Sequence, residues 1–204
     1  MNALLLNALY ETIFMTFLAT FIGLAVGIPM GAVLYSSSRS PTYRFLSGCI
    51  NILRSIPYII MIILLIPLTR LLIGTSIGMG AAIFPLSIVA ILLIARALED
   101  AMHTVPQDLL DIGYKATPFK KLCYIVFPEA LPIFTKSTVS IIINIVGFSA
   151  MSGVVGGGGL GDLAVRYGYQ RYDVFLVFMI VLLLIGLVQL IQCIGNYFSA
   201  RLNP

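Results

Sequence analysis

Residues 174–197 read VFLVFMIVLLLIGLVQLIQCIGNY, a run of 24 residues without a charged side chain. A helix crosses the hydrocarbon core of a bilayer with about 20 apolar residues, since each residue advances the helix by about 1.5 Å. The stretch therefore predicts a transmembrane helix, and it makes an all-α membrane protein the expected fold class.

Similar apolar stretches occur elsewhere in the chain, and we predict five transmembrane helices in all, over residues 12–35, 46–68, 81–97, 133–151 and 174–197. The second is unusual because Arg54 lies inside it. Between Arg54 and Arg70 there are 15 uncharged residues, which reach about 22 Å as a helix. Either Arg54 faces a protein interior, or the ends of this span extend their charged side chains to the membrane surface.

The composition of the whole chain agrees with a membrane protein. Of its 204 residues 60% are apolar and only 10% are charged, and the mean hydropathy is +1.06. Soluble domains carry about 25% charged residues, so this chain has too little charge to hydrate a globule. The net charge of +4 collects between the apolar stretches, which favours contact with membrane lipid over binding of nucleic acid. Cys49, Cys123 and Cys193 lie far apart, so we expect buried thiols and neither a disulfide framework nor a metal site.

The distribution of basic residues predicts the orientation of the helices. An N-terminus outside and a C-terminus in the cytoplasm leave three arginines outside: Arg70, Arg166 and Arg171. The same orientation places eight basic residues on the cytoplasmic side: Arg39, Arg44, Arg96, Lys115, Lys120, Lys121, Lys136 and Arg201. Cytoplasmic loops carry the excess of Lys and Arg, so this orientation is expected. No basic residue precedes the first stretch, which therefore does not read as a cleaved signal peptide.

Two glycine patterns predict close packing. Gly23, Gly27 and Gly31 lie on one face of the first helix, where they let a neighbouring backbone approach, either within this chain or in a second subunit. Residues 149–162 contain six glycines within nine positions. No Lys-Ser or Lys-Thr pair follows them, as a phosphate-binding loop requires. We therefore expect a closely packed turn at the outer end of the helices.

The longest polar interval, residues 98–132, lies between the third and fourth predicted spans and would be cytoplasmic. Two short helices are expected in it, one after Pro106 and one starting at Pro118 behind Thr117. The second has an apolar face and a basic edge, and Pro128 and Pro132 are expected to break it before the next span. Such a helix lies either on lipid or in a groove of a partner protein.

Several polar groups fall at membrane depth near Arg54, namely Asn51, Ser55, Asn144 and Ser149. They would either line a cavity or make hydrogen bonds between helices.

Three of these segments carry a resemblance to a known family. Residues 51–78 read NILRSIPYIIMIILLIPLTRLLIGTSIG, residues 146–172 read VGFSAMSGVVGGGGLGDLAVRYGYQRY, and residues 127–132 read FPEALP. In this order they resemble the permease subunit of bacterial ATP-binding-cassette importers of the methionine-uptake type. The resemblance covers nearly the whole chain, including Tyr10-Glu11-Thr12 and the stretch 27–31.

The resemblance implies one transmembrane domain over residues 1–204, in the bacterial inner membrane. Two copies of the chain would form the pore, and two cytoplasmic ATP-binding-cassette ATPase subunits would power it. ATP and Mg²⁺ would bind to those ATPases, so this chain would be no enzyme and would hold no cofactor or metal of its own. An external methionine-binding lipoprotein would deliver the substrate, D- or L-methionine.

The resemblance also implies that the cytoplasmic loop couples the permease to the ATPase, with residues 117–121 as a short helix in a groove of that partner. Its motif aligns in two ways. One places the family's acid and glycine at Leu109 and Lys115; the other, shorter by two residues, places them at Asp111 and Gly113. We prefer the second, because a lysine in a glycine turn would be strained. The expected coupling residues are Asp111, Gly113, Ala116, Thr117, Pro118, Phe119, Lys120, Lys121, Pro128 and Glu129.

On this interpretation Asn51, Ser55, Asn144 and Ser149 border the translocation path, and Met151 with the glycine segment helps to close its outer end. The alternatives are an importer of another small amino acid or a proton-coupled secondary transporter. Proton coupling needs an acid deep in a helix, whereas all acids near the spans fall at predicted helix ends: Glu11, Glu99, Asp100, Asp162 and Asp173. An intramembrane enzyme is disfavoured, because the only histidine, His103, lies in the cytoplasmic loop.

Overall fold

The computed structural model describes residues 2–37, 40–106, 108–109 and 117–202. Within these residues the chain is helical and contains no strand, which confirms the all-α prediction. The helices are α1 (Asn2–Ser36), α2 (Pro41–Ser55), α3 (Tyr58–Ile73), α4 (Met79–His103), α6 (Pro118–Lys121), α7 (Phe127–Val154), α8 (Gly159–Leu163) and α9 (Val174–Leu202). Two π-helical segments, Leu122–Val126 and Ala164–Tyr169, continue α6 and α8.

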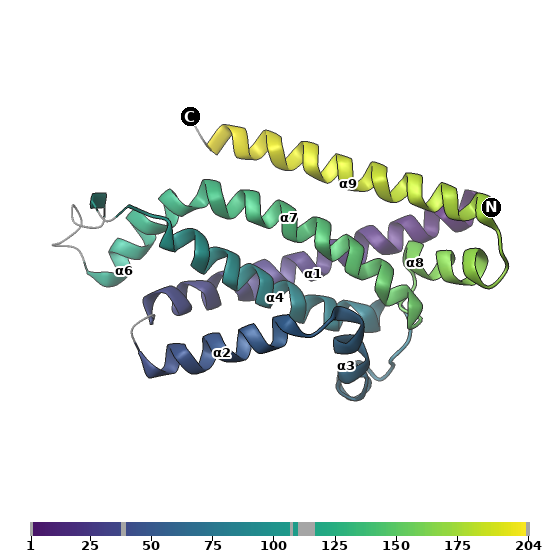
Figure 1. Cartoon of the computed structure of the whole chain (residues 1–204), viewed down its shortest axis with the longest axis horizontal. Coiled ribbons are helices and arrows are strands. Elements are labelled where there is room, and N and C mark those ends of the chain that lie inside the picture. The colour runs from purple at the N-terminus through teal and green to yellow at the C-terminus, as the bar shows by residue number, and fades with distance from the viewer. Residues whose placement is uncertain (1, 38–39, 107, 110–116, 203–204) are drawn as a thin grey trace.

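Four helices in the described part of the chain are long and apolar enough to cross a membrane: α1, α4, α9 and the helical stretch Phe119–Val154 that contains α7. They include four of the five predicted spans. Figure 1 shows them running side by side along the long axis of the molecule, with the N-terminus at one end and α6 and the C-terminus at the other.

The second predicted span, residues 46–68, is broken by a sharp bend, and the bent pair of helices counts as a fifth span only if the two cross the membrane together. The chain forms α2 and α3 there, and its direction bends by 109° between the two helices. The break lies at Ile56, whose backbone is extended (φ −77°, ψ 124°) and precedes Pro57. Proline lacks an N–H for the helical ladder and pushes the residue before it out of the α region, so the break follows from the local sequence.

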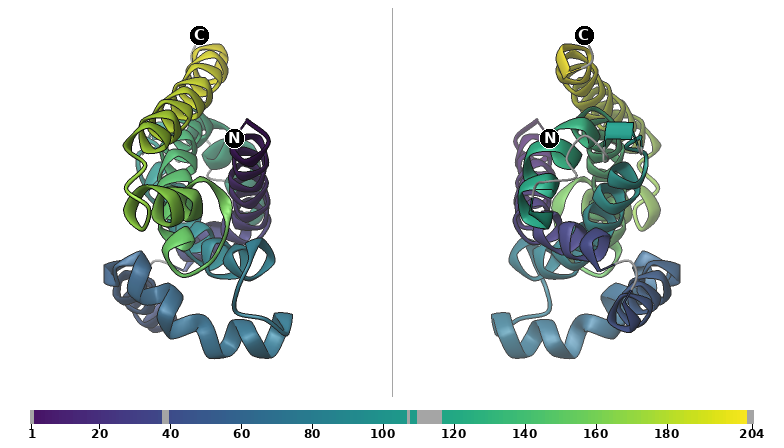
Figure 2. Two further views of the ribbon diagram at one scale, coloured as in Figure 1. Left: turned by 90° about the vertical axis from the view of Figure 1, so that its right-hand side faces the viewer. Right: turned by 90° about the vertical axis from the view of Figure 1, so that its left-hand side faces the viewer.

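Helix α4 lies at the centre of the bundle, where it contacts α1, α2, α3 and α7. In its most apolar stretch 56% of the residues are buried, against 11% in α9. Helix α9 lies at the edge (Figures 1 and 2), so its apolar side chains are exposed to the surroundings of the bundle. That arrangement suits a lipid-facing helix, since lipid and apolar side chains are equally apolar.

The three glycines of α1 pack against α4 of the same chain. A Cβ atom at Gly23 would lie 2.7 Å from the Cβ of Ala90, and one at Gly31 would lie 2.6 Å from the carbonyl oxygen of Ala95. Both distances are too short for any side chain. The small residues therefore serve packing within the chain, which answers the question left open between an internal contact and a subunit interface.

The polar interval predicted over residues 98–132 differs from its prediction at both ends. Helix α4 continues to His103, so Glu99, Asp100 and His103 lie in a helix and not in the loop. Pro128 and Pro132 do not break the chain either, because it stays helical from Phe119 to Val154. The π-helical turn Leu122–Val126 lies just before Phe127 and Pro128. Its wider hydrogen-bond ladder gives the proline ring room that a regular α-turn would not.

Candidate functional site

The corner between α2 and α3 is tied to α7 by Tyr58. Its ring stacks on Phe148 with centroids 4.8 Å apart, and its hydroxyl lies 2.8 Å from Ser152 Oγ. Ser152 donates its own proton to the carbonyl of Phe148, so the Tyr58 hydroxyl is the donor to Ser152. Tyr58 and Ser152 are buried and Phe148 is half-buried, so these contacts fix the start of α3 on the last turns of α7.

The glycine segment after α7 is a closely packed turn, as predicted. Gly156, Gly158 and Gly159 have positive φ values of 82°, 81° and 75°, a conformation that residues with a Cβ rarely adopt. A Cβ at Gly153 would overlap the backbone nitrogen of Asp162. The N–H of Gly78 donates to the carbonyl of Gly156 (2.8 Å), so the turn also holds the connection from α3 to α4.

Two side chains of α1 hold the first turn of α8. Glu11 Oε2 accepts the N–H of Gly159 at 2.7 Å, and Thr12 Oγ1 accepts the N–H of Leu160 at 2.9 Å. The first N–H groups of a helix have no partner within it, so these oxygens satisfy them. The glycine segment is thus fixed to α1 on one side and to the connection between α3 and α4 on the other.

The predicted path residues are spread over two helices, and most lie on the surface of the single chain. Asn51 and Ser55 are exposed on α2, where the Ser55 hydroxyl donates to the carbonyl of Asn51 (2.8 Å). Asn144 is exposed on α7, and the side chain of Met151 is 47% exposed. Ser149 is buried and donates to the carbonyl of Val146 in its own helix (2.7 Å). The two serines therefore bond within their helices and not between helices.

Arg54 is exposed at the end of α2. It borders a cavity of about 70 Å³ that Ile56, Tyr58 and Phe148 also line. Neither alternative considered for this arginine matches the single chain. Arg54 is not buried in the protein, and it does not lie at the end of a continuous span, because the chain bends after Ser55.

The segment that we predict to couple to an ATPase lies partly within the described residues. Asp111, Gly113 and Ala116 lie outside the described residues. Thr117 and Lys120 are exposed, and so is Phe119, whose side chain is 74% exposed. Helix α6 begins at Pro118, as predicted, and the N–H of Lys121 donates to the carbonyl of Thr117 (2.9 Å). Pro128 and Glu129 are exposed in the first turn of α7.

A buried ionic cluster joins α2 to α4, and the sequence analysis missed it. The side chain of Glu99 is 1% exposed. It accepts a hydrogen bond from the Tyr43 hydroxyl (2.7 Å) and one from Arg96 Nη1 (2.8 Å). Arg96 also donates to Ser47 Oγ (3.1 Å). The signal in the sequence was the spacing of Arg96 and Glu99, which places opposite charges on one helix face.

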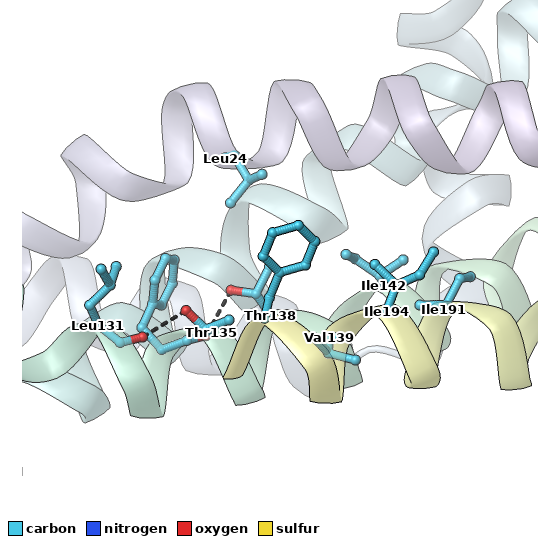
Figure 3. A pocket seen from close by; sticks show the side chains of 11 residues that line it. Leu24, Leu131, Thr135, Thr138, Val139, Ile142, Ile191 and Ile194 are labelled. Carbon is cyan, nitrogen blue, oxygen red and sulfur yellow. Dashed lines mark hydrogen bonds between the residues drawn. The ribbon is translucent and has the colours of Figure 1, made fainter. Parts of the chain in front are cut away.

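An apolar cavity of about 400 Å³ lies between α1, α7 and α9. Figure 3 shows Leu24 of α1 facing Leu131, Thr135 and Thr138 of α7 across it. The two threonine hydroxyls donate to carbonyls of their own helix (2.8 Å each), so they offer no donor to a ligand. None of the predicted path residues lines this cavity.

Comparison with known proteins gives one consistent result. Residues 23–204 match the family model described as binding-protein-dependent transport system inner membrane component. The probable D-methionine transport system permease protein MetI of Vibrio cholerae is 41% identical over 179 residues, which cover 84% of this chain and 80% of the relative. The D-methionine transport system permease protein MetI of Escherichia coli K12 is 40% identical over 158 residues, covering 74% of this chain and 73% of the relative.

The fold also matches a solved structure along its whole length. An inward-facing conformation of the MetNI methionine ABC transporter contains a chain that superposes with a TM-score of 0.96 at 38% identity. The match covers 100% of this chain and 98% of the other.

Proposed function

The chain belongs to the family of binding-protein-dependent transport system inner membrane components, and on that premise we propose that it is the permease subunit of an ATP-driven importer of methionine. It is an inner-membrane protein with several apolar helices able to span the bilayer. The observation that carries the proposal is the match over the full chain to a methionine ABC transporter, together with relatives named as methionine permeases.

In this proposal the chemistry that supplies energy belongs to a partner. Two cytoplasmic ATPase subunits bind ATP and Mg²⁺, and the permease alternates between inward-open and outward-open states. Helix α6 docks in a groove of the ATPase, with Thr117, Pro118, Phe119, Lys120 and Lys121 at the contact. The exposed ring of Phe119 beside two lysines supports this, because an aromatic anchor with charged neighbours is typical of a protein contact. Asp111, Gly113 and Ala116 before α6, and Pro128 and Glu129 after it, complete the proposed coupling segment.

We propose the orientation with the N-terminus outside and the C-terminus in the cytoplasm. Helix α6 and the end of α9 lie at the same end of the molecule (Figure 1), and Lys120, Lys121 and Arg201 lie there too. Arg166 and Arg171 lie near the opposite end, beside the start of α1. The excess of basic residues at the end with α6 supports a cytoplasmic location for it.

The translocation path is proposed to lie between two copies of the chain. Asn51 and Ser55 on α2, and Asn144 and Met151 on α7, are exposed in the single chain. Polar groups at membrane depth are costly against lipid, which supports a second copy or a water-filled path in front of them. Ser149 would also border the path, and Met151 with the glycine segment would help to close its outer end. The whole chain would act as one transmembrane domain.

Proton coupling receives no support from the acids that the structure describes. Glu11 holds the start of α8, Glu99 is paired with Arg96, and Asp162 is paired with Arg166. A proton carrier must be free to change partners during each cycle, whereas these three carboxylates are engaged in hydrogen bonds within the chain.

Uptake by reconstituted vesicles tests the proposal. We expect vesicles that contain the permease, the ATPase and the external binding protein to accumulate labelled methionine only when ATP is supplied on the ATPase side. Competition by unlabelled D-methionine, L-methionine and other small amino acids would measure the substrate preference. Uptake that persists without ATP and without the ATPase, and that an uncoupler abolishes, would show a secondary transporter instead.

A further inference from the structure

A second large cavity, of about 390 Å³, lies at the end of the bundle where α1 begins. One wall is the first three turns of α1, and the other is α8 with the π-helical turn that follows it. Figure 2, left, looks onto this end of the molecule. Unlike the apolar cavity of Figure 3, this one has a mainly polar lining, which includes Asn7, Glu11, Asp162, Arg166, Gln170 and Arg171.

The charges in this cavity are only partly used by the protein. Arg166 Nε donates to Asp162 Oδ1 at 2.8 Å, which leaves the other oxygen of Asp162 and the terminal nitrogens of Arg166. Glu11 uses one oxygen on the N–H of Gly159. The guanidinium of Arg171 lies over the ring of Tyr167, 4.6 Å from its centroid. Among the described residues, Arg171 has no carboxylate within salt-bridge distance.

These groups carry two positive and two negative charges in one cavity. A multiply charged anion would be attracted by the arginines and repelled by the two carboxylates, so it fits poorly. A ligand with one oxyanion and one ammonium group fits both halves: the arginines can bind the oxyanion through several N–H donors, and the carboxylate oxygens can accept from the ammonium. Asn7 and Gln170 offer further donors and acceptors.

The surroundings of the cavity indicate where such a ligand comes from. Tyr10, Tyr169 and Tyr172 are exposed near it, the last with 82% of its surface. Exposed tyrosines gather at the level of lipid headgroups. Immediately after them α9 begins with Val174 and Phe175, both exposed, and continues as the helix that faces lipid. The polar cavity therefore meets an apolar surface at the depth where a phospholipid has its phosphate above its acyl chains.

We propose that this cavity binds the headgroup of a zwitterionic phospholipid that carries a phosphodiester and a primary ammonium. Arg171 and the terminal nitrogens of Arg166 bind the phosphodiester, and the free oxygens of Glu11 and Asp162 accept from the ammonium. The acyl chains run along the exposed start of α9. The orientation in the proposed function places this cavity at the outer leaflet of the membrane. The chemistry of headgroup binding does not depend on that orientation.

Native mass spectrometry of the permease with its ATPase partner tests this proposal. The complex is exchanged into micelles with equal amounts of phosphatidylethanolamine, phosphatidylcholine and phosphatidylglycerol, and the retained lipid is counted. We expect phosphatidylethanolamine to be retained over the other two. Arg171→Gln should lower that retention about fivefold, the effect of one basic side chain near a lipid surface, and Arg171→Lys should restore part of it. Arg70→Gln, which changes an exposed arginine at the end of α3, should leave it unchanged.

Soluble ligands distinguish the source of the headgroup. Glycerophosphoethanolamine carries the same phosphodiester and ammonium without acyl chains, and free methionine carries a carboxylate and an ammonium. We expect neither to displace the retained lipid at millimolar concentration. Displacement by methionine would instead identify a substrate site and overturn the lipid assignment. Equal retention in the wild type and in Arg171→Gln, with unchanged elution and melting temperature, would overturn the site itself. Both results are independent of transport, so a failure here leaves the proposed importer function standing.

Discussion

At the scale of single residues, the least expected finding is the burial of Glu99. A carboxylate is almost never fully buried unless it is paired, and this one is satisfied by Tyr43 from α2 and Arg96 from its own helix. The ring of Tyr35 also lies 5.0 Å from that of His103, one turn further along α4. The cluster connects three helices near the end of the bundle that carries α6.

Replacing Glu99 by alanine should therefore destabilise the protein. Removing one partner of a buried pair costs about 3–5 kcal/mol. Arg96 keeps 23% of its side chain exposed, so we expect a cost below that range, about 2–3 kcal/mol, because the remaining charge can be hydrated. Denaturant-induced unfolding in detergent, monitored by susceptibility to trypsin, measures the loss in the free energy of unfolding. Asp100→Ala is the matched control, because Asp100 is exposed and 3.5 Å from the same arginine; an equal effect of both substitutions would contradict a special role for Glu99.

At the scale of elements, the apolar runs predicted four of the spans because length and hydropathy suffice for a straight helix in lipid. They failed at Ile56–Pro57, because the averaged hydropathy of residues 46–68 does not register the missing N–H of one proline. The apolar runs also placed the end of α4 too early, because its last turns carry charged residues typical of a loop. Glu99 can nevertheless be buried in a helix because it is paired with Arg96. The contact of Glu11 with the start of α8 spans 148 positions in the sequence, a distance that no local pattern reveals.

The close contact of α7 with α8 gives a prediction at this scale. Alanine at Gly153 would drive a methyl group into the backbone of Gly161 and Asp162, which has no side chain that can move aside. We expect Gly153→Ala to lower the free energy of unfolding by about 3 kcal/mol, the upper range for overpacking. Gly186→Ala on α9 is the control, because no atom lies within 4 Å of that site. A melting temperature that is the same for both variants would show that α8 can separate from α7 at little cost.

At the scale of the whole molecule, α6 and α8 lie at opposite ends of the bundle (Figure 1). The helical stretch Phe119–Val154 runs from α6 to the glycine segment without interruption. A displacement of α6 by a partner would therefore be carried along one continuous element to Tyr58, Ser152 and the turn beyond them. Composition and basic-residue counts predict the membrane location and the orientation, but they contain no information about this connection.

The exposed ring of Phe119 allows the coupling to be tested. Phe119→Asp should abolish ATP-dependent methionine uptake while the protein still inserts, because the aspartate would be desolvated without a partner in the ATPase groove. Co-purification with the ATPase should fall in parallel. Phe119→Leu, which keeps an apolar anchor, should retain most of both activities. Normal uptake and normal ATPase recovery in Phe119→Asp would remove α6 from the proposed contact.

The break between α2 and α3 has a further consequence, for how the chain can exist in a bilayer at all. Where a helix stops, its last carbonyl groups lose their intrahelical donors, and hydrocarbon provides no replacement for them. Each such group costs several kcal/mol when it faces acyl chains, so irregular backbone at membrane depth occurs only where protein or water covers it. Asn51 to Pro57 are exposed on the isolated chain, apart from the half-buried Ile56. In the proposed arrangement, a single subunit in lipid would expose the carbonyl groups at this break to acyl chains. A second copy of the chain would cover these groups, so pairing would solvate the break in place of water.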